Sequence, residues 1–265
     1  MENVLYSGTS GLILPVPNKQ YYPPEFRDKS RLTYYSSLFN SIEINSSFYK
    51  VPMPATVKKW SESVADDFKF TFKLWQGITH QKEFSFDREL LRKFIHTIDQ
   101  VGDKKGSLLV QLPPGTGVKH VPQLLRLMHT IREENPSCSW DLALEFRNPS
   151  WYVETTYNLM QAFDAGLVLH DKPGAATPMI HHRTDFIYLR FHGPKGDYKG
   201  GYDDNFLTEY AGYIHEWKRE GKRVYVYFNN TAGDAIRNLQ TLNNELDRLF
   251  MYDIHNLKLK VHIKY

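Results

Sequence analysis

The stretch IYLRFHGPKGDYKG, residues 187–200, changes from an apolar strand into a glycine-rich loop. Apolar residues at 187, 189 and 191 alternate with Tyr188, Arg190 and His192, and this period of two is typical of a β-strand. One face of the strand therefore carries an arginine and a histidine just before a flexible loop. What this arrangement means depends on whether the other strands of the chain end in the same way.

Apolar runs of strand length recur along the 265 residues. They cover 4–8, 41–45, 69–75, 108–112, 142–147, 166–171, 186–192 and 224–230. Most are separated by apolar stripes with helical spacing, at 90–101, 121–131, 206–217 and 239–249. Eight strands that alternate with helices, without a linker, predict one TIM-barrel domain, a (β/α)8 barrel, over residues 1–265. An open doubly wound sheet is the alternative, but GTSG after the first strand lacks the glycine spacing of a dinucleotide site.

Three local features complete the predicted fold. The interval KPGAATPMIHHRT, 172–184, is too short for an ordinary crossover helix, so we expect an irregular barrel between the sixth and seventh strands. Thr231 and Asp234 have the spacing of a capping box at the start of the last helix. The tail LKLKVHIKY, 257–265, alternates like a strand but has no place in the barrel.

Composition narrows the class of protein. Hydrophobic residues at 41% and charged residues at 24% are ordinary for a globular chain, and a net charge of +3 does not by itself indicate nucleic acid. Cys138 is the single cysteine, so neither an intrachain disulfide nor a thiolate metal site is expected. The start MENVLYSGTSG lacks the features of a signal peptide, and no run reaches 18 apolar residues. We expect a cytoplasmic protein without a membrane partner.

Polar side chains follow the inward face of the predicted barrel. In each strand the apolar set should face the helices, which leaves the alternate set to line the interior. In the second to eighth strands that set ends in polar residues, at the end of the barrel where such enzymes keep their active sites. These residues are Glu43, Asn45, Thr71, Lys73, Gln111, Glu145, Arg147, His170, Arg190, His192, Tyr227 and Asn229. Buried polar groups without partners cost about 1–3 kcal/mol each, so the set predicts a binding or catalytic mouth.

Two arginines in this set suggest the charge of the ligand. Arg147 and Arg190 offer planar guanidinium groups suited to a phosphate or carboxylate. The loops after the seventh and eighth strands, with a helix N-terminus, form the usual phosphate site of barrel enzymes. We therefore expect an anionic, phosphate-bearing ligand, either a small molecule or a polymer. The alternative is that the two arginines only neutralise Glu43 and Glu145.

Six stretches of the chain resemble one protein family. SIEINSSFYKVP, FKLWQGITH, VQLPP, LEFRNPSW, YLRFHGPKGDYKGGY and VYVYFNNTAGDA are similar to the domain-of-unknown-function 72 family, in order and over almost the whole chain. The chain departs from the family at Ser47, where a threonine is usual, and at Asn148, where a histidine is common. The resemblance implies a TIM barrel but no particular reaction. It places signature residues at Glu43, Asn45, Tyr49, Lys73, Thr79, His80, Gln111, Glu145, Arg147, Asp171, Arg190, His192, Tyr198, Asn229 and Asn230.

The favoured function is a metal-independent enzyme with hydrolase- or lyase-type activity on a phosphorylated substrate. Glu43 and Glu145 are the predicted general base and acid, because carboxylates near several cations can be tuned in opposite directions. Lys73, Arg190 and His192 would stabilise developing negative charge. A Schiff base at Lys73 is disfavoured because two nearby carboxylates would raise the pKa of the lysine.

Two other function classes remain open. In a metal-dependent hydrolase or isomerase, His170, His192 and Asp171 could join the glutamates as ligands. The inward cations would repel a divalent ion, so we expect no metal or other cofactor. In a nucleic-acid-binding or nuclease-like protein, aromatic and basic residues around the mouth would stack on bases and contact phosphates. Those residues are Tyr49, Trp75, Tyr198, Tyr202, Lys195 and Lys199.

Overall fold

Eight parallel strands form the centre of the molecule. The computed structural model describes residues 5–137, 139–178 and 184–262, and the side chains only as far as residue 255. Neighbouring strands follow the order β1-β8-β7-β6-β5-β4-β3-β2. Their bounds are β1 Leu5–Thr9, β2 Ser41–Ile44, β3 Lys69–Lys73, β4 Lys105–Leu112, β5 Asp141–Phe146, β6 Gly166–His170, β7 Phe186–Phe191 and β8 Arg223–Phe228. Each predicted strand lies within a few residues of an observed one.

The first and second strands close the barrel through few backbone contacts. A single parallel bridge joins Ser10 to Glu43. Below it the Tyr35 hydroxyl lies between the strands, where it accepts from the Thr9 N–H at 2.8 Å and donates to the Ser41 carbonyl at 3.1 Å. A tyrosine side chain therefore replaces part of the ladder, and the sheet becomes a nearly closed barrel.

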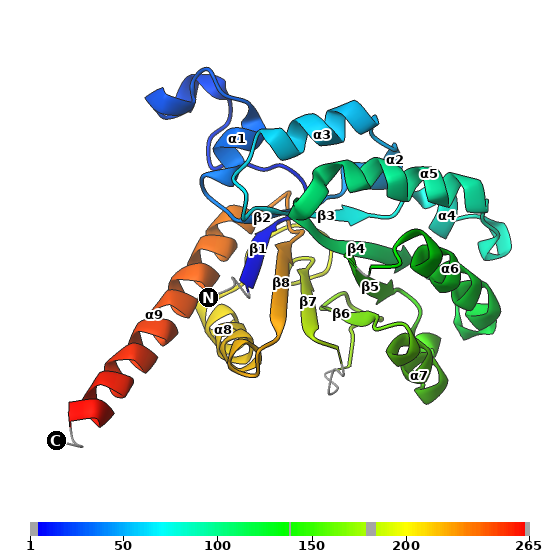
Figure 1. Ribbon diagram of the computed structural model, residues 1–265. Coiled ribbons are helices and arrows are strands. Elements are labelled where there is room, and N and C mark those ends of the chain that lie inside the picture. The colour runs from blue at the N-terminus through cyan, green and yellow to red at the C-terminus, as the bar shows by residue number, and fades with distance from the viewer. Residues whose placement is uncertain (1–4, 138, 179–183, 263–265) are drawn as a thin grey trace.

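Helices surround the strands (Figure 1). They are α1 Arg31–Ser36, α2 Ser46–Tyr49, α3 Pro54–Glu62, α4 Gln76–Thr79, α5 Arg88–Ile98, α6 Val121–Glu134, α7 Glu154–Ala162, α8 Asp204–Arg219 and α9 Ala235–His262. The four stripes predicted from the sequence lie on α5, α6, α8 and α9. The predicted (β/α)8 barrel is confirmed.

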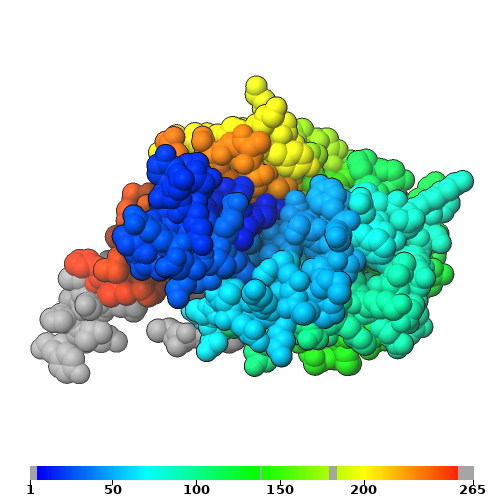
Figure 2. Space-filling model, turned by 90° about the horizontal axis from the view of Figure 1, so that it is seen from above, coloured from blue at the N-terminus to red at the C-terminus, as the bar shows by residue number. Residues whose placement is uncertain are grey.

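The structure shows the place of the tail and corrects one local expectation. The tail does not form a strand as far as it is described, because α9 continues through it to His262; the last three residues lie outside the described part. Figure 1 shows the end of α9 extending away from the body of the molecule, and in Figure 2 the red-coloured part of the chain lies at its edge. Thr231 does not cap this helix either, because 231–234 form a turn and α9 begins at Ala235.

The interval between β6 and β7 contains no helix in its described part, 171–178 and 184–185. Thr177 fastens this segment to β6 instead. Its hydroxyl donates to the Val168 carbonyl at 2.7 Å, and its N–H donates to the His170 carbonyl at 3.0 Å. The barrel is irregular at the place predicted.

Two apolar clusters follow the alternation of the strands. The larger one lies between the strands and the helices, and it includes Ile42, Phe72, Leu144 and Leu189. The smaller one fills the barrel interior with Tyr6, Leu109, Ala143, Val168, Phe186, Tyr188, Tyr225 and Tyr227. Above this tyrosine-rich interior lie the polar residues that end the strands. Among the described residues, no helix is both long and apolar enough to cross a membrane.

Candidate functional site

A buried ion pair between Glu43 and Arg190 lies at the top of the barrel interior. Arg190 Nε donates to the two Glu43 carboxylate oxygens at 3.1 and 3.0 Å, and Nη2 donates to Oε1 at 2.8 Å. The Tyr188 hydroxyl donates to Oε2 at 2.5 Å, and the Ser10 hydroxyl donates to Oε1. Because Glu43 and Arg190 are almost completely buried, this carboxylate has its partners within the protein.

Glu145 connects this pair to a second arginine. Arg190 Nη1 donates to Glu145 Oε2 at 3.1 Å, and Arg147 Nη2 forms an ion pair with Glu145 Oε1. Glu145 is fully buried and Arg147 is 8% exposed. Two carboxylates and two guanidinium groups therefore form one continuous row of charges across the mouth, in the order Glu43, Arg190, Glu145, Arg147.

The arginines keep both glutamates ionised. Burial raises the pKa of Glu43, but the charge and hydrogen bonds of Arg190 more than offset it and lower the pKa overall. Burial acts in the same direction on Glu145, and there Arg147 and Arg190 hold the pKa well below its usual range. Neither carboxylate holds a proton at neutral pH. We infer that Glu43 and Glu145 position the arginines rather than act as the general base and acid expected from the sequence.

His192 is a neutral ring held between the arginines and an aspartate. Its Nε2 lies 2.7 Å from Arg147 Nη2 and 3.1 Å from Arg190 Nη1. A guanidinium only donates, so Nε2 accepts and the Nδ1–H faces Asp171 Oδ1 at 3.3 Å. Burial lowers the pKa of His192 to about 4 despite the hydrogen bond to Asp171. The ring is uncharged at neutral pH, so it does not supply the positive charge predicted for it.

Asp171 ties together the loops that follow β6 and β7. Its Oδ1 accepts the His192 backbone N–H at 2.9 Å, and the Tyr202 hydroxyl donates to its Oδ2. The same hydroxyl accepts the Gly193 N–H at 2.6 Å. Burial raises the pKa of Asp171, but the hydrogen bonds from His192 and Tyr202 lower it overall. Asp171 and Tyr202 are both predicted site residues. Asp171 orients His192 through hydrogen bonds, and Tyr202 in turn holds Asp171.

Lys73 stands apart from these pairs. It ends β3 with 6% of its surface exposed, and its Nζ lies 3.9 Å from the centre of the Phe48 ring. No hydrogen bond or ion pair joins this Nζ to another described residue. The Phe48 ring also contacts the ring of His80, which meets it edge-on with the ring centres 4.9 Å apart.

The net direction expected for the pKa of Lys73 was wrong, although the two carboxylates do raise this pKa as expected. Burial lowers the pKa of Lys73 to about 7, and the positive charge of Arg190 lowers it further, against the smaller opposing effect of Glu145 and Glu43. The carboxylates have little net influence because their charges are already matched by the arginines. Lys73 can therefore exist as a free amine near neutral pH.

Some buried polar atoms at the mouth have no partner. In the described part of the chain, five residues have a buried side-chain polar atom without a hydrogen bond: Asn45, Gln123, Arg147, Thr156 and Asn230. Three of the five lie within two residues of the ends of β2, β5 and β8. In Arg147 both Nε and Nη1 lack acceptors. Such groups are rare in folded proteins and call for an explanation.

The glycine-rich loop after β7 folds back over the mouth. Tyr198 N–H donates to the His192 carbonyl at 2.8 Å, and Gly196 N–H donates to the Gly193 carbonyl at 2.7 Å. Gly193 has a φ of 93°, and a Cβ there would lie 2.3 Å from the Lys199 carbonyl oxygen. Glycine is required at this position because the loop returns so closely. Tyr198 adopts a φ of 67° and is 39% exposed at the rim.

The remaining predicted residues lie around this centre with different surroundings. Gln111 and Asn229 are buried on the inward face, whereas Tyr49 is 65% exposed at the rim. His170 is buried, and its Nε2 lies 3.0 Å from the Phe146 carbonyl. Asn230 donates to the Gly200 carbonyl at 2.9 Å and to Asn238 at 3.0 Å, so its amide holds the loop rather than facing the mouth.

The sequence and fold comparisons agree with this architecture. The model of the family described as "Protein of unknown function DUF72" matches residues 6–254. The chain belongs to the DUF72 family. A curated relative, UPF0759 protein YunF of Bacillus subtilis, is 28% identical over 264 aligned residues, with 85% of this chain and 90% of the relative covered.

Two crystal structures share the fold of this DUF72 chain. The DUF72 family protein EF0366 of Enterococcus faecalis has a TM-score of 0.73 at 21% identity, with 92% of this chain and 95% of that chain covered. The DUF72 family protein TM1631 of Thermotoga maritima has a TM-score of 0.70 at 24% identity, and the alignment covers 92% of this chain and 99% of the other. The family and the TIM barrel are thus established for this chain.

Three residues of the DUF72 site were missed in the sequence. Ser10 and Tyr188 bind Glu43, and Phe48 covers Lys73. Tyr188 shares the inward face of β7 with Arg190, so the alternation contained its signal. Ser10 lies beyond the end of β1, and Phe48 lies on a four-residue helix, where strand alternation carries no information.

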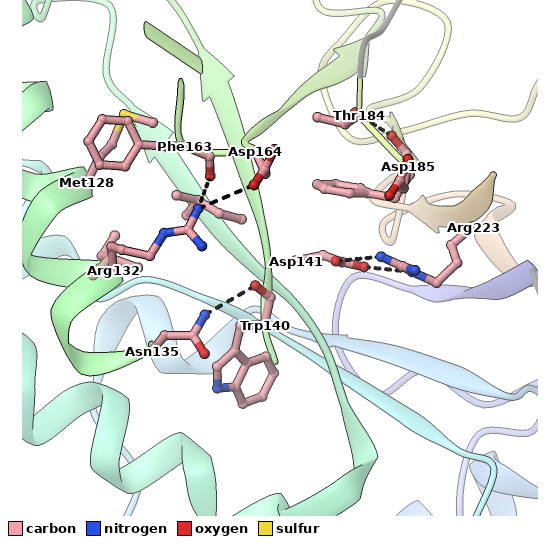
Figure 3. A pocket seen from close by; sticks show the side chains of 13 residues that line it. Met128, Arg132, Asn135, Trp140, Asp141, Phe163, Asp164, Thr184, Asp185 and Arg223 are labelled. Atoms are coloured by element: carbon pink, nitrogen blue, oxygen red, sulfur yellow. Dashed lines mark hydrogen bonds and ion pairs between the residues drawn. The ribbon is translucent and has the colours of Figure 1, made fainter. Parts of the chain in front are cut away.

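A second hollow lies at the opposite end of the barrel, which we call the floor. It has a volume of about 230 Å³ and is lined by the amino-terminal ends of strands and by α6. Figure 3 shows the paired side chains that border it. Arg223 donates to both oxygens of Asp141 at 3.1 and 2.9 Å, and Tyr225 adds a third hydrogen bond at 2.8 Å. Active sites of TIM barrels occupy the other end, so the mouth is the stronger candidate.

Histidine and carboxylate side chains at the mouth do not gather into a metal-ligand group. Throughout residues 5–137, 139–178 and 184–255, no three His, Cys, Asp or Glu side chains come together in that way. His192 and Asp171 form a hydrogen bond with each other, and Glu43 and Glu145 form ion pairs with arginines. Cys138 lies outside the described residues.

Proposed function

We propose that this chain is an enzyme that binds a small anionic substrate at the mouth of the barrel and transforms it by proton transfer. The observation that carries the proposal is the pair of unpartnered donors, Nε and Nη1, on the buried Arg147. Its Nε–H and Nη1–H groups point to different sides of the guanidinium, so an oxygen of a bound carboxylate or phosphate would satisfy one of these donors. The sequence predicted a phosphate-bearing ligand, whereas the proposal extends to small anions in general and assigns their binding to Arg147.

Arg190 supports the anion site indirectly. Its five donors are directed at Glu43, Glu145, His192 and Ser10, so it has little capacity left for a ligand. Its role is to hold Glu145, which in turn fixes one end of Arg147. A guanidinium anchored at Nη2 and open at Nε and Nη1 is pre-organised for an anion, and this lowers the entropy lost on binding.

Lys73 is the group best placed to move a proton. It is buried, lacks a hydrogen-bonding partner among the described residues, and has a pKa of about 7. Proton-transfer catalysis is most effective when the pKa of the catalytic group lies near the working pH. The Phe48 ring excludes water from one side of the amine. The proposed chemistry uses no metal ion or other cofactor.

A thermal-shift series tests the proposed anion site. Phosphate, sugar phosphates and mono- and dicarboxylates should be compared with chloride at matched ionic strength. A ligand at a hundredfold excess over its Kd stabilises the native state by about 2.7 kcal/mol, which produces a clear increase in Tm. Arg147→Met should abolish the specific increase, while Arg223→Met at the floor should keep it. The proposal fails if no anion exceeds chloride, or if Arg147→Met responds like the unsubstituted protein.

A nucleic acid is the second candidate ligand, on a different observation. Tyr49 and Tyr198 are 65% and 39% exposed at the rim, and the Lys172 ammonium lies 4.4 Å from the centre of the Tyr198 ring. Exposed aromatic rings next to cations can stack on bases. Binding to a fluorescent single-stranded oligonucleotide at several salt concentrations tests this candidate. The nucleic-acid candidate requires that the affinity for the oligonucleotide falls as the salt concentration rises. It also requires that the double variant Tyr49→Ala, Tyr198→Ala no longer binds.

A further inference from the structure

The mouth contains an amine whose surroundings suit covalent chemistry. Lys73 Nζ is buried against Phe48, and no described carboxylate pairs with it. A buried lysine ordinarily needs an ionic partner. The two carboxylates whose charges act on Lys73, Glu43 on the neighbouring β2 and Glu145 on β5, are bound to arginines. The burial of Lys73 therefore serves no ion pair.

The guanidinium of Arg147 indicates which kind of ligand would reach this amine. Arg147 is more than nine-tenths buried and keeps two donors without acceptors. It follows β5, and Lys73 ends β3, with β4 between them. Strands in a sheet are about 4.8 Å apart, so the two backbones are separated by roughly 10 Å. Both side chains lie on the inward face with Gln111 of β4 between them, and the charge of Arg147 acts on Lys73, so we infer that one small molecule at the mouth reaches both.

We propose that Lys73 forms an imine with the carbonyl group of a 2-oxo acid whose carboxylate is held by Arg147. This inference rests on the proposed anion site and specifies its substrate class. In a 2-oxo acid the carboxylate and the carbonyl carbon are directly bonded, which matches an anion-binding group and a nucleophile converging on one mouth. The ionised glutamates repel a free carboxylate from the rest of the site.

The reaction is balanced without any further reagent. The free amine of Lys73 attacks the carbonyl carbon, and a proton moves from nitrogen to oxygen to give a carbinolamine. Loss of one water, made from the hydroxyl and the remaining proton on nitrogen, leaves a neutral imine, which takes up one proton from solvent to become the protonated imine. A lysine must be partly unprotonated to start this sequence, and the lowered pKa of Lys73 meets that condition. The protonated imine can accept an electron pair from an adjacent bond, as lyase-type chemistry requires.

His80 packs against the same aromatic ring as this amine. Its imidazole meets that ring, Phe48, edge-on. Burial and the nearby Lys73 charge lower the pKa of His80, so the imidazole is neutral and can accept a proton near pH 7. Thr79 holds the ring through a contact of 2.8 Å between its hydroxyl and Nδ1.

Reductive trapping tests the inference. The protein is incubated at pH 7 with pyruvate and sodium cyanoborohydride, and the adduct is located by intact mass and peptide mapping. We expect one reduced pyruvyl group per chain, on Lys73. Lys73→Met should lose the adduct, and Lys172→Arg, a substitution of another lysine at the mouth, should keep it. Mapping of the unsubstituted protein gives the answer even if Lys73→Met does not fold.

Arg147→Met separates the two halves of the inference. In this variant the rate of pyruvate trapping, divided by the rate of trapping of acetaldehyde, which has no carboxylate, should fall at least tenfold. An adduct spread over several lysines, or equal trapping of pyruvate by Arg147→Met, overturns the inference. If pyruvate raises the Tm through Arg147 but no adduct forms, the imine is wrong and the anion site stands. A third outcome is that pyruvate neither raises the Tm nor is trapped, while another anion raises the Tm through Arg147. In that case the anion site stands and only the assignment of a 2-oxo acid fails.

Discussion

The two ends of this barrel both carry arginine–carboxylate pairs, and they differ in what is left unpaired. At the floor, Arg223 and Asp141 form a two-point pair that Tyr225 completes. At the mouth, Arg147 keeps two donors without acceptors, and Lys73 has no hydrogen-bonding partner in the described structure. A buried unpaired donor costs about 1–3 kcal/mol. A site that retains such groups is organised for a ligand, whereas a fully paired site is organised for stability.

The largest effect should come from removing the arginine at the centre of the mouth. Arg190→Met leaves Glu43 and Glu145 buried with fewer partners, and breaking a buried ion pair costs about 3–5 kcal/mol. Urea denaturation at pH 7 measures this loss. Adding Glu43→Gln to the variant should recover part of the stability, because one buried charge is then removed. A loss below about 1 kcal/mol would show that the mouth is not a structural unit as described.

Lys73→Met should have a smaller effect of opposite sign. The folded-state pKa of Lys73 is about 7, below its ordinary value of 10.5. Between these pH values the unfolded chain binds a proton that the folded protein has released, so the stability of the unsubstituted protein rises with pH. Below pH 7 the full cost of burying the charge is present. The variant should therefore be more stable near pH 6, by on the order of 2 kcal/mol.

The difference between the Lys73→Met variant and the unsubstituted protein should narrow as the pH approaches 10. Denaturation curves of both proteins at pH 6, 8 and 10 check this trend. Subtracting one free energy of unfolding from the other cancels the contributions of the titrating groups that the two proteins share. A gap that stays constant with pH would mean that the pKa of Lys73 is ordinary. That result would also remove the support for a free amine at neutral pH.

The smallest effect is expected at the floor. Arg223→Met removes a pair whose arginine side chain is 38% exposed, and exposed pairs contribute about 0–1 kcal/mol. The same denaturation assay should show a loss near that value, and the response to anions should not change. A loss as large as that of Arg190→Met would erase the distinction between the two ends of the barrel.

The fold could be predicted because it depends on local alternation. Ile42 and Ile44 face the helices while Glu43 faces the interior, and the same parity holds in each following strand. The same alternation of inward and outward side chains also identified most residues of the mouth. The tail shows the limit of the method: LKLKVHIKY alternates like a strand, but without a sheet edge to join it continues the preceding helix.

The state of each charged side chain could not be predicted. Arg147 and Arg190 are the same residue type on inward faces, yet only Arg190 is saturated. Its donors meet acceptors on Glu43, Glu145, His192 and Ser10. Counting nearby carboxylates likewise gave the wrong direction for the pKa of Lys73. Which carboxylates are already paired is a property of the tertiary structure alone.

The location of a bound anion tests the central claim most directly. Crystals soaked in selenate, a tetrahedral oxyanion, can be measured at the selenium absorption edge, where an anomalous map shows the anion without ambiguity. The account predicts a peak at the mouth, within hydrogen-bonding distance of Arg147 Nε or Nη1, and no such peak in crystals of Arg147→Met. Selenate bound only at the floor beside Arg132 or Arg223, or a mouth that stays empty at saturating selenate, would contradict it.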